Sequence, residues 1–331
     1  MAMKTIIYKG SFVHNYKDVH VALGNFDGVH QGHCHIIEKL VESSRQRQGT
    51  AIVATFDPHP LHVIRSQNPP KLLTPTPVKI ELMRQLGVDA LLLLSFNEQL
   101  AQLSPDEFVD QILQNDLRSQ KVMVGFNYSF GRQGVGTSEL LEKLGKEKGF
   151  DVEIIDAVMI DGEPVSSTRI RNALAEGDLE KASRLLGYRP FIAGKVISGE
   201  KRGRKLGFPT MNLQIDRNQL LPRRGVYIAF STLPGFDTKF ATLVNIGVKP
   251  TFGNYLESVE AHILDFSGHV YGQTVIVHLL HLIRPEIAFE QVSQLVEQME
   301  KDKAYTRQYL QRQSQHSILE KIRDVKITFL E

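Results

Sequence analysis

The chain has 331 residues, with 39 basic and 37 acidic side chains and a formal net charge of +2. A chain of this length usually folds into two domains, each with its own hydrophobic core. The balanced charge excludes a global electrostatic attraction to nucleic acid or to an anionic membrane, so any site for a polyanion must be local. We therefore expect no nucleic-acid partner and no membrane partner, and the sequence does not indicate an oligomeric state.

Cysteine use and the apolar segments indicate the compartment. The one cysteine, Cys34, excludes an internal disulfide and a multi-cysteine metal site, and it fits a reducing compartment. The first ten residues, MAMKTIIYKG, have neither the sustained apolar core nor the small-residue cleavage pattern of a secretory signal. Because no stretch is long and apolar enough to span a membrane, the sequence predicts a cytoplasmic protein.

The first half of the chain alternates strand-like apolar runs with segments of helical periodicity. Nearly continuous apolar runs are typical of strands buried on both faces of a parallel sheet, which helices then cover. We therefore predict an α/β domain with a parallel sheet. The expected strands are 19–26, 50–56, 88–96, 121–126 and 150–156, and the expected helices are 32–48, 77–87, 105–115 and 138–149.

A helical stretch from about Ile170 to Gly187 bridges the two halves of the chain. Gly177 is expected to divide it into two short helices, because glycine interrupts a helical pattern. We include this bridge in the first domain. The predicted domains are therefore residues 1–186 and residues 187–331.

The second half is built from short strands separated by Gly, Pro and charged turns. This pattern indicates an antiparallel barrel or sandwich. Helical periodicity returns over 289–302, where five apolar residues share one face, so a terminal helix is expected to pack against the strands. The expected strands are 191–198, 225–233, 239–247, 258–266 and 274–283, and the apolar helical residues are Phe289, Val292, Leu295, Val296 and Met299.

The segment GNFDGVHQGH, residues 24–33, follows the first buried strand and opens the next helix. Ligands bind at this position in open α/β sheets. His30 and His33 share a face if the helix has begun there, and Gly32 between them admits a close phosphate. A helix start adds backbone N–H groups and the positive end of the dipole. For the bare H-x-G-H pattern, a glycine-rich turn with two surface histidines is an equally good interpretation.

A second block, SSTRIR at residues 166–171, also stands at a helix start. Ser166, Ser167 and Thr168 are natural N-caps, and capping alone would explain them. Arg171 lies one turn further on, where it could reach an anion held at that helix start. Considered together with the histidine pair, the block favours a clamp on a triphosphate.

The segment KRGRKLGFPTMNL, residues 201–213, follows the first strand of the second half. Its basic residues and two glycines beside an ordered proline could cradle phosphates. Charge runs are usually surface features, so by itself this segment is better interpreted as a solvated basic loop.

The strand SVEAHILDF contains the acidic candidate of the second half. Strict alternation places Val259, Ala261 and Ile263 on one face of the strand, and Glu260 and His262 on the other. A glutamate on a strand most often faces solvent, so alternation alone gives Glu260 no function.

The first half resembles the nucleotidyltransferase superfamily, and its GNFDGVH form resembles the branch that makes FAD from FMN and ATP. TFDPHP (55–60), VGFNYSFG (124–131) and VSSTRIR extend the resemblance, which implies a Rossmann-like sheet of the HxGH type. Asn127 and Tyr128 depart from the Asp and Phe more often found there, so the flavin side matches less closely than the ATP side. The residues implied to bind ATP are Gly24, Asn25, Phe26, Asp27, His30, Gly32, His33, Ser167, Thr168 and Arg171, and those implied to bind the flavin are His59 and Asn127.

The second half resembles riboflavin kinases over nearly its whole length. GFPTMN is similar to the PTAN motif of that family, with Met211 in place of the usual Ala, and NIGVKPTFG, VEAHILDF, VYGQ and HLIRPE follow in the family's order. The resemblance implies an antiparallel barrel in which Thr210 and Asn212 hold Mg²⁺ and nucleotide phosphates and Glu260 is the catalytic base. It also implies nucleotide contacts for Gly203, Lys205 and Gly207, and a flavin contact for Arg284, for which a surface arginine before a proline is a competing interpretation.

Together the two halves resemble bifunctional riboflavin kinase/FMN adenylyltransferases, with riboflavin, FMN, FAD and ATP as small-molecule partners. Phosphorylation starts from a neutral ribityl hydroxyl, so a base is useful. In adenylyl transfer the FMN phosphate is already ionised, so alignment and charge stabilisation suffice, and His30, His33 and Arg171 fit that role with Mg²⁺ shared among the phosphates.

Three other interpretations stay open. The first domain could be degenerate or prefer the reverse reaction, the whole chain could be a flavin-binding regulator without turnover, or the first domain could adenylylate pantetheine phosphate or a phosphoalcohol. Supplying FMN directly separates the first of these from the leading hypothesis. Two phosphate clamps and a base speak against a pure binder, and the kinase-like second half speaks against another acceptor.

Overall fold

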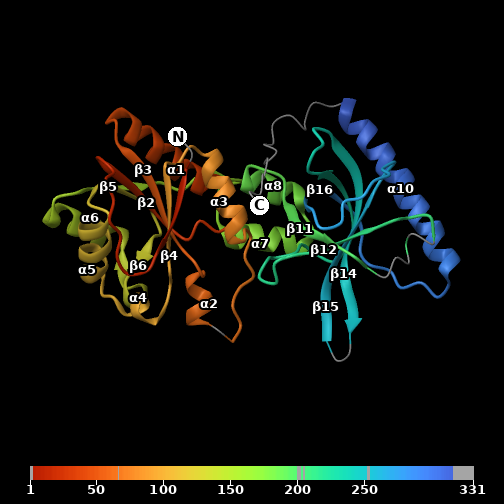
Figure 1. The fold of residues 1–331 in the computed structure, drawn as a ribbon, viewed down its shortest axis with the longest axis horizontal. Helices are drawn as coiled ribbons and strands as arrows, with labels where there is room; N and C mark the ends of the chain where they lie inside the picture. The colour runs from red at the N-terminus through yellow and green to blue at the C-terminus, as the bar shows by residue number, and fades with distance from the viewer. Residues whose placement is uncertain (1–2, 66, 200–202, 204–205, 252–253, 316–331) are drawn as a thin grey trace. The chain divides into compact units, whose positions relative to one another are not determined.

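The computed structural model describes residues 3–65, 67–199, 203, 206–251 and 254–315 (Figure 1). The chain forms two compact units, residues 1–166 and residues 167–331. The bridging helices therefore group with the second unit, whereas the sequence placed them in the first domain.

The first unit is built on a six-stranded parallel sheet with the order β1-β4-β3-β2-β5-β8. All residues of β2 and β4 are buried, as the continuous apolar runs predicted. β1 was not expected from the sequence and forms one edge of the sheet beside β4. The strands are β1 (Lys4–Tyr8), β2 (Val19–Leu23), β3 (Thr50–Phe56), β4 (Ala90–Leu94), β5 (Ser119–Gly125) and β8 (Asp151–Ile155).

Helices connect the strands, so the α/β class predicted from the sequence is confirmed. The expected helix over 105–115 contains a single α-turn followed by a π-helix, whose buried residues join the main core of this unit. The helices are α1 (Gln31–Gln46), α2 (Pro60–Ile64), α3 (Thr76–Gln85), α4 (Glu98–Gln102), α5 (Pro105–Phe108), the π-helix η1 (Val109–Asp116), the 3₁₀ turn η2 (Arg132–Gly134) and α6 (Ser138–Lys148). Two short hairpins complete the unit: β6 (Ser129–Phe130) with β7 (Gly136–Thr137), and β9 (Met159–Ile160) with β10 (Glu163–Pro164).

The second unit begins with two helices, α7 (Ser167–Glu176) and α8 (Leu179–Leu186). Gly177, with a φ of +81°, lies between them, which confirms the predicted break. α8 ends at Gly187, whose left-handed conformation closes the helix.

A closed antiparallel barrel follows, with the order β11-β12-β15-β14-β13-β16. Closure settles the choice between barrel and sandwich and leaves no unpaired edge. β12 was missed, because its sequence lies in a segment rich in Gly, Pro and basic residues. The strands are β11 (Phe191–Ile197), β12 (Met211–Gln214), β13 (Gly225–Thr232), β14 (Lys239–Thr251), β15 (Asn254–Ile263) and β16 (Thr274–Arg284).

The terminal helix α10 (Val292–Gln315) is longer than predicted and begins three residues later. Phe289 precedes it, and Val292 in its first turn is 61% exposed, so Val292 does not belong to the packing face. Leu295 and Met299 do face the barrel, where they line a cavity.

Candidate active sites

The segment 24–33 forms the turn between β2 and α1, at the carboxyl edge of the parallel sheet. β2 lies between β3 and β5, which is the position where strand order reverses and where such sheets bind ligands. Three residues of this turn have positive φ: Phe26 at 47°, Gly28 at 92° and Val29 at 36°. Left-handed conformations of this kind are costly for side chains with a β-carbon, and they persist only where surrounding contacts hold them.

His30 and His33 lie against each other at the start of α1. His30 is the N-cap, and its Nδ1 accepts a hydrogen bond from the backbone N–H of His33 at 3.3 Å. The two imidazole rings stack with centroids 3.6 Å apart. A β-carbon on Gly32 would stand 3.3 Å from the His30 ring, so a side chain there would require the ring to shift slightly. The prediction that the two histidines share a face is confirmed.

Both histidines are neutral at pH 7. Burial lowers the pKa of His30 to about 4, although the nearby Asp27 carboxylate opposes the shift. Burial also lowers the pKa of His33 well below its ordinary value, and the His30 ring and the Lys79 ammonium add to the shift. The Nδ1 of His33 is buried and has no hydrogen-bond partner among the described residues. The pair therefore offers neutral imidazole nitrogens at a helix start.

Three side chains that the sequence analysis did not single out hold the turn in place. The Asn25 carbonyl accepts hydrogen bonds from Thr55 Oγ1 at 3.0 Å and from Lys79 Nζ at 2.8 Å. The Asp27 carboxylate accepts the backbone N–H of Thr74 at 3.1 Å, and Thr74 Oγ1 in turn accepts the N–H of Gly28 at 2.9 Å. Asp27 thus supports the loop from within, since it is only 2% exposed.

The expected flavin-side residues follow the two strands that flank β2. His59 is buried and caps α2, with its Nδ1 accepting the N–H of Leu61 at 3.2 Å. Asn127 is exposed in the turn after β5. Because β3 and β5 are parallel to β2 and adjacent to it, the turns that follow them lie at the same edge of the sheet as the histidine pair.

Ser167, Thr168 and Arg171 lie in α7, which belongs to the second compact unit. The helix begins at Ser167, so Ser167 and Thr168 occupy its first turn, and of the three expected caps Ser166 alone precedes it. The joint clamp with His30 and His33 remains a prediction.

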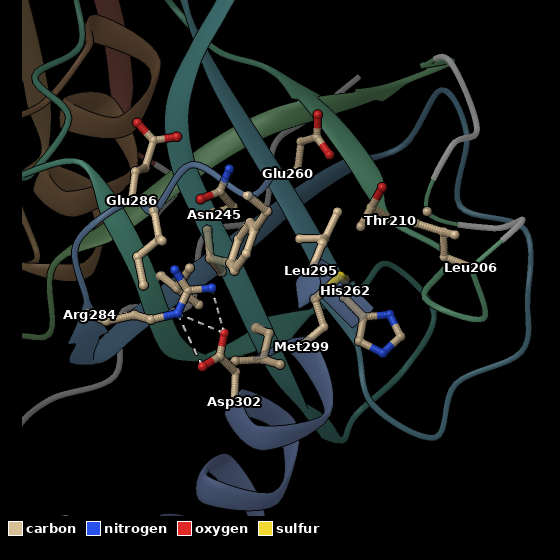
Figure 2. A pocket seen from close by; sticks show the side chains of 16 residues that line it. Leu206, Thr210, Asn245, Glu260, His262, Arg284, Glu286, Leu295, Met299 and Asp302 are labelled. Carbon is tan, nitrogen blue, oxygen red and sulfur yellow. Dashed lines mark hydrogen bonds and ion pairs between the residues drawn. The ribbon is translucent and has the colours of Figure 1, made fainter. Parts of the chain in front are cut away.

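The second unit contains a cavity of about 320 Å³ between the outer surface of the barrel and α10 (Figure 2). Its polar lining comes from Thr210, from residues of β14, β15 and β16, and from Asp302 of α10, and its apolar lining includes Leu295 and Met299 of α10. A concave site with a few convergent polar groups is typical of a small-molecule pocket.

A row of paired positions crosses the barrel at this cavity, and each of its residues except Asn212 lines the cavity. Asn212 on β12 pairs with Glu260 on β15, and Glu260 pairs with Asn245 on β14. Asn245 pairs with Val226 on β13, which pairs with Arg284 on β16. Directly paired residues of antiparallel strands point to the same face, so five strands present these side chains on one surface of the barrel.

Glu260 lies on the strand face opposite the core, as the alternation predicted, and this face lines the cavity. Val259, Ala261 and Ile263 are at most 5% exposed and face the core, whereas Glu260 and His262 line the cavity. Figure 2 shows Glu260 and Asn245 on adjacent strands of the cavity wall, with the Glu260 carboxylate directed away from the Asn245 amide. Because α10 covers this part of the barrel, the outer face of β15 forms a cavity wall and is not a freely solvated surface.

The PTMN segment lies at one end of the cavity. Thr210 lines it, and Gly203 does so as well. The Gly203 carbonyl accepts the N–H groups of Leu206 and Phe208 at 3.0 and 2.9 Å, and a β-carbon on Gly203 would collide with the Phe208 carbonyl. This tight turn requires glycine.

The structure supports no nucleotide contact for the two other predicted residues. Gly207 is exposed with a φ of +85° and does not line the cavity. Lys205 lies outside the described residues. Their nucleotide contacts remain predictions.

Arg284 is an internal residue of the site, which excludes the competing interpretation of a surface arginine. Its side chain is 14% exposed and pairs with the Asp302 carboxylate of α10, with Nη2 to Oδ2 at 2.8 Å. Asp302 was missed by the sequence analysis, because it appeared there as the last charged residue of an amphipathic helix.

Two family models match the chain: the one described as FAD synthetase covers residues 13–169, and the one described as riboflavin kinase covers residues 186–310. A bifunctional riboflavin kinase/FMN adenylyltransferase from Listeria monocytogenes is 39% identical over 87% of this chain and 91% of its own. The chain belongs to the family of bifunctional riboflavin kinase/FMN adenylyltransferases.

Other members of this family give the same result. The Bacillus subtilis enzyme is 38% identical over 86% of this chain and 90% of its own, and the Escherichia coli enzyme is 34% identical over 87% and 92%. A crystal structure titled a macrolide-efflux protein from Streptococcus pneumoniae superposes with a TM-score of 0.81 and 30% identity, covering 92% of this chain and 99% of that one. Among the described residues, no helix combines the length and the apolar character needed to cross a membrane.

Proposed function

We propose that the two activities of this bifunctional enzyme reside in separate sites, built from the residues described above. The chain phosphorylates riboflavin with ATP to give FMN, and it adenylylates FMN with a second ATP to give FAD and pyrophosphate. The observation that supports the kinase site best is that Glu260 and Asn245 line one cavity with Thr210, while Asn212 pairs with Glu260 on the neighbouring strand.

In the kinase site, Glu260 accepts the proton of the ribityl hydroxyl as that hydroxyl attacks the γ-phosphorus of ATP, the bond from this phosphorus to the β–γ bridging oxygen breaks, and ADP leaves. A carboxylate that lines a partly apolar cavity beside amide groups is a suitable base for a neutral hydroxyl. Thr210 and Asn212 would hold Mg²⁺, because a hydroxyl and an amide carbonyl are hard oxygen ligands. The described residues contain no cluster of three or more His, Cys, Asp or Glu, which fits a metal whose remaining ligands come from ATP and water.

In the adenylyltransferase site, the residues align two substrates that need no base. The start of α1 offers backbone N–H groups and the two imidazoles to the triphosphate. His59 and Asn127 contact the flavin phosphate side, and Arg171 stabilises the leaving pyrophosphate. Mg²⁺ would here be held by the phosphates themselves.

We also propose that the enzyme acts in the cytoplasm on free riboflavin, FMN and ATP. The single cysteine, Cys34, fits a reducing compartment, and the balanced charge of the chain fits small-molecule substrates.

Glu260→Gln tests the kinase assignment. The amide cannot accept the proton, so we expect FMN formation from riboflavin to fall about 10²- to 10⁴-fold, while adenylylation of supplied FMN continues at the parent rate. Glu257→Gln, an exposed carboxylate on the same strand, is the matched control and should retain both activities. Loss of both activities in a folded Glu260→Gln variant would contradict separate sites.

A further inference from the structure

Arg284 and Asp302 form a buried ion pair at the cavity of the second unit. Arg284 is the last residue of β16, and Asp302 lies in the third turn of α10 and is 3% exposed. The Arg284 Nε donates to both carboxylate oxygens at 3.2 and 3.1 Å, and Nη2 donates to Oδ2 at 2.8 Å. Both residues line the cavity, and Figure 2 shows the pair below Asn245.

The carboxylate is itself fixed in place by its own helix. Gln298 Nε2, one turn earlier on α10, donates to Asp302 Oδ1 at 2.8 Å. A fork of this kind fixes the plane of a guanidinium as well as its distance. The orientation of Arg284 is therefore imposed by α10.

Residues that follow β16 make the other contacts of the Arg284 guanidinium. Arg284 Nη1 donates to the Pro285 carbonyl at 3.2 Å, and the guanidinium carbon lies 5.9 Å from the centre of the Phe289 ring. Among the described residues, these bonds use three of the five N–H donors of an arginine. Two donors stay available to a ligand in the cavity.

Stability alone is a weak reason for such a pair. Desolvating two charges often costs as much as their attraction returns, and apolar residues of similar volume would pack there at least as well. Leu295 and Met299 already provide apolar packing between α10 and the barrel around the cavity. The pair is better explained by what its fixed geometry presents to the cavity.

We propose that Asp302 is a positioning residue of the riboflavin kinase step: it holds the Arg284 guanidinium so that its free N–H groups meet acceptor atoms of the bound flavin. This inference rests on the proposed flavin contact of Arg284. It also makes α10 a part of the site, because the helix supplies the carboxylate that orients a substrate-binding group.

The test is a double-mutant cycle with Asp302→Asn and Arg284→Met, measured by quenching of riboflavin fluorescence on binding and by the KM for riboflavin. If Asp302 acts through Arg284, each single change should weaken riboflavin binding about tenfold or more, and the double variant should be no weaker than Arg284→Met alone. The KM for ATP in the kinase step and the adenylylation of supplied FMN should stay at the parent values.

Glu297→Gln is the matched control, because it removes an exposed ion pair with Lys301 on the same helix and should leave riboflavin binding unchanged. Parent-like binding in Asp302→Asn, or losses that multiply in the double variant, would overturn the positioning role. Parent-like binding in Arg284→Met would instead overturn the proposed flavin contact. If circular dichroism shows that Asp302→Asn unfolds the barrel, Asp302→Glu takes its place in the cycle. The longer side chain displaces the carboxylate by one methylene and with it the guanidinium. Riboflavin binding should again weaken, and the double variant should again be no weaker than Arg284→Met alone.

Discussion

At the scale of single residues, burial decides the charge of the groups that we propose to meet the nucleotide. Burial removes water from the His30 and His33 imidazoles and lowers their pKa, which favours the neutral form. The negative charge of a bound triphosphate would favour protonation instead. Lys79 is buried as well, and burial lowers its pKa while the Asp27 and Asp57 carboxylates oppose the shift. These charged and polar groups hold the loop in a shape ready to receive the phosphates.

His30→Asn tests the cost of keeping this imidazole neutral. The folded pKa of about 4 lies below the ordinary value of 6.5, so between these values the unfolded chain binds a proton that the folded chain does not. Stability should therefore fall as the pH drops through this range, by up to about 3 kcal/mol for this one group. Asn keeps an acceptor at the start of α1 but does not titrate.

We expect the variant to lose less thermal stability than the parent between about pH 7 and about pH 5. The measurement is the midpoint of thermal unfolding of each protein at each pH, followed by circular dichroism, which does not depend on the activity of the site. An equal loss in the two proteins would show that His30 is not held neutral by the fold.

Sequence reasoning reached some residues of the sites and not others. It found His30, His33 and Glu260, because local spacing defines which face they occupy. It missed Lys79 and Asp302, whose roles depend on tertiary partners far away in the chain. A charged residue in a helix is usually exposed, and only the folded chain shows that these two are buried and paired.

At the scale of elements, the direction of a side chain could be predicted but its neighbours could not. The period of two in β15 placed Glu260 opposite the core-facing residues. The register that brings Asn212 and Asn245 beside it depends on strands that pair across the barrel, and no local pattern encodes that pairing. β12 itself was interpreted as part of a turn, since four residues between Gly and Pro signals give no clear alternation.

Gly177→Ala tests the break between α7 and α8. A β-carbon there would be held at a φ of +81° and would stand 2.7 Å from the Leu282 Cδ2 atom. Gly235→Ala is the matched control, because Gly235 has a φ of +79° and no atom within 4 Å of the added carbon.

The backbone strain should cost each variant about 1–2 kcal/mol of unfolding free energy. The contact with Leu282 should add a further loss of about 1 kcal/mol or more in Gly177→Ala. Urea unfolding followed by kinase activity measures the difference. Equal losses in the two variants would mean that the helix break has room for a side chain.

At the scale of the whole molecule, two units of different architecture carry two steps that share an intermediate. The family models end at residue 169 and begin again at residue 186, so they leave most of the predicted bridge outside both. The boundary at 186 therefore remains a prediction, while contacts assign α7 and α8 to the second unit. The α/β class of the first half and the antiparallel strands of the second were predictable from periodicity and turn composition, which change sharply near Arg189. These patterns left barrel and sandwich open, and the barrel and the order of the two activities were expected from the family resemblance.

The product of the kinase step is the substrate of the adenylyltransferase step, and this connection is the central claim. The most direct measurement incubates the purified chain with riboflavin, ATP and Mg²⁺ and separates the flavins over time. The account predicts that FMN appears first and that FAD and pyrophosphate then accumulate from it. Formation of neither FMN nor FAD would contradict it.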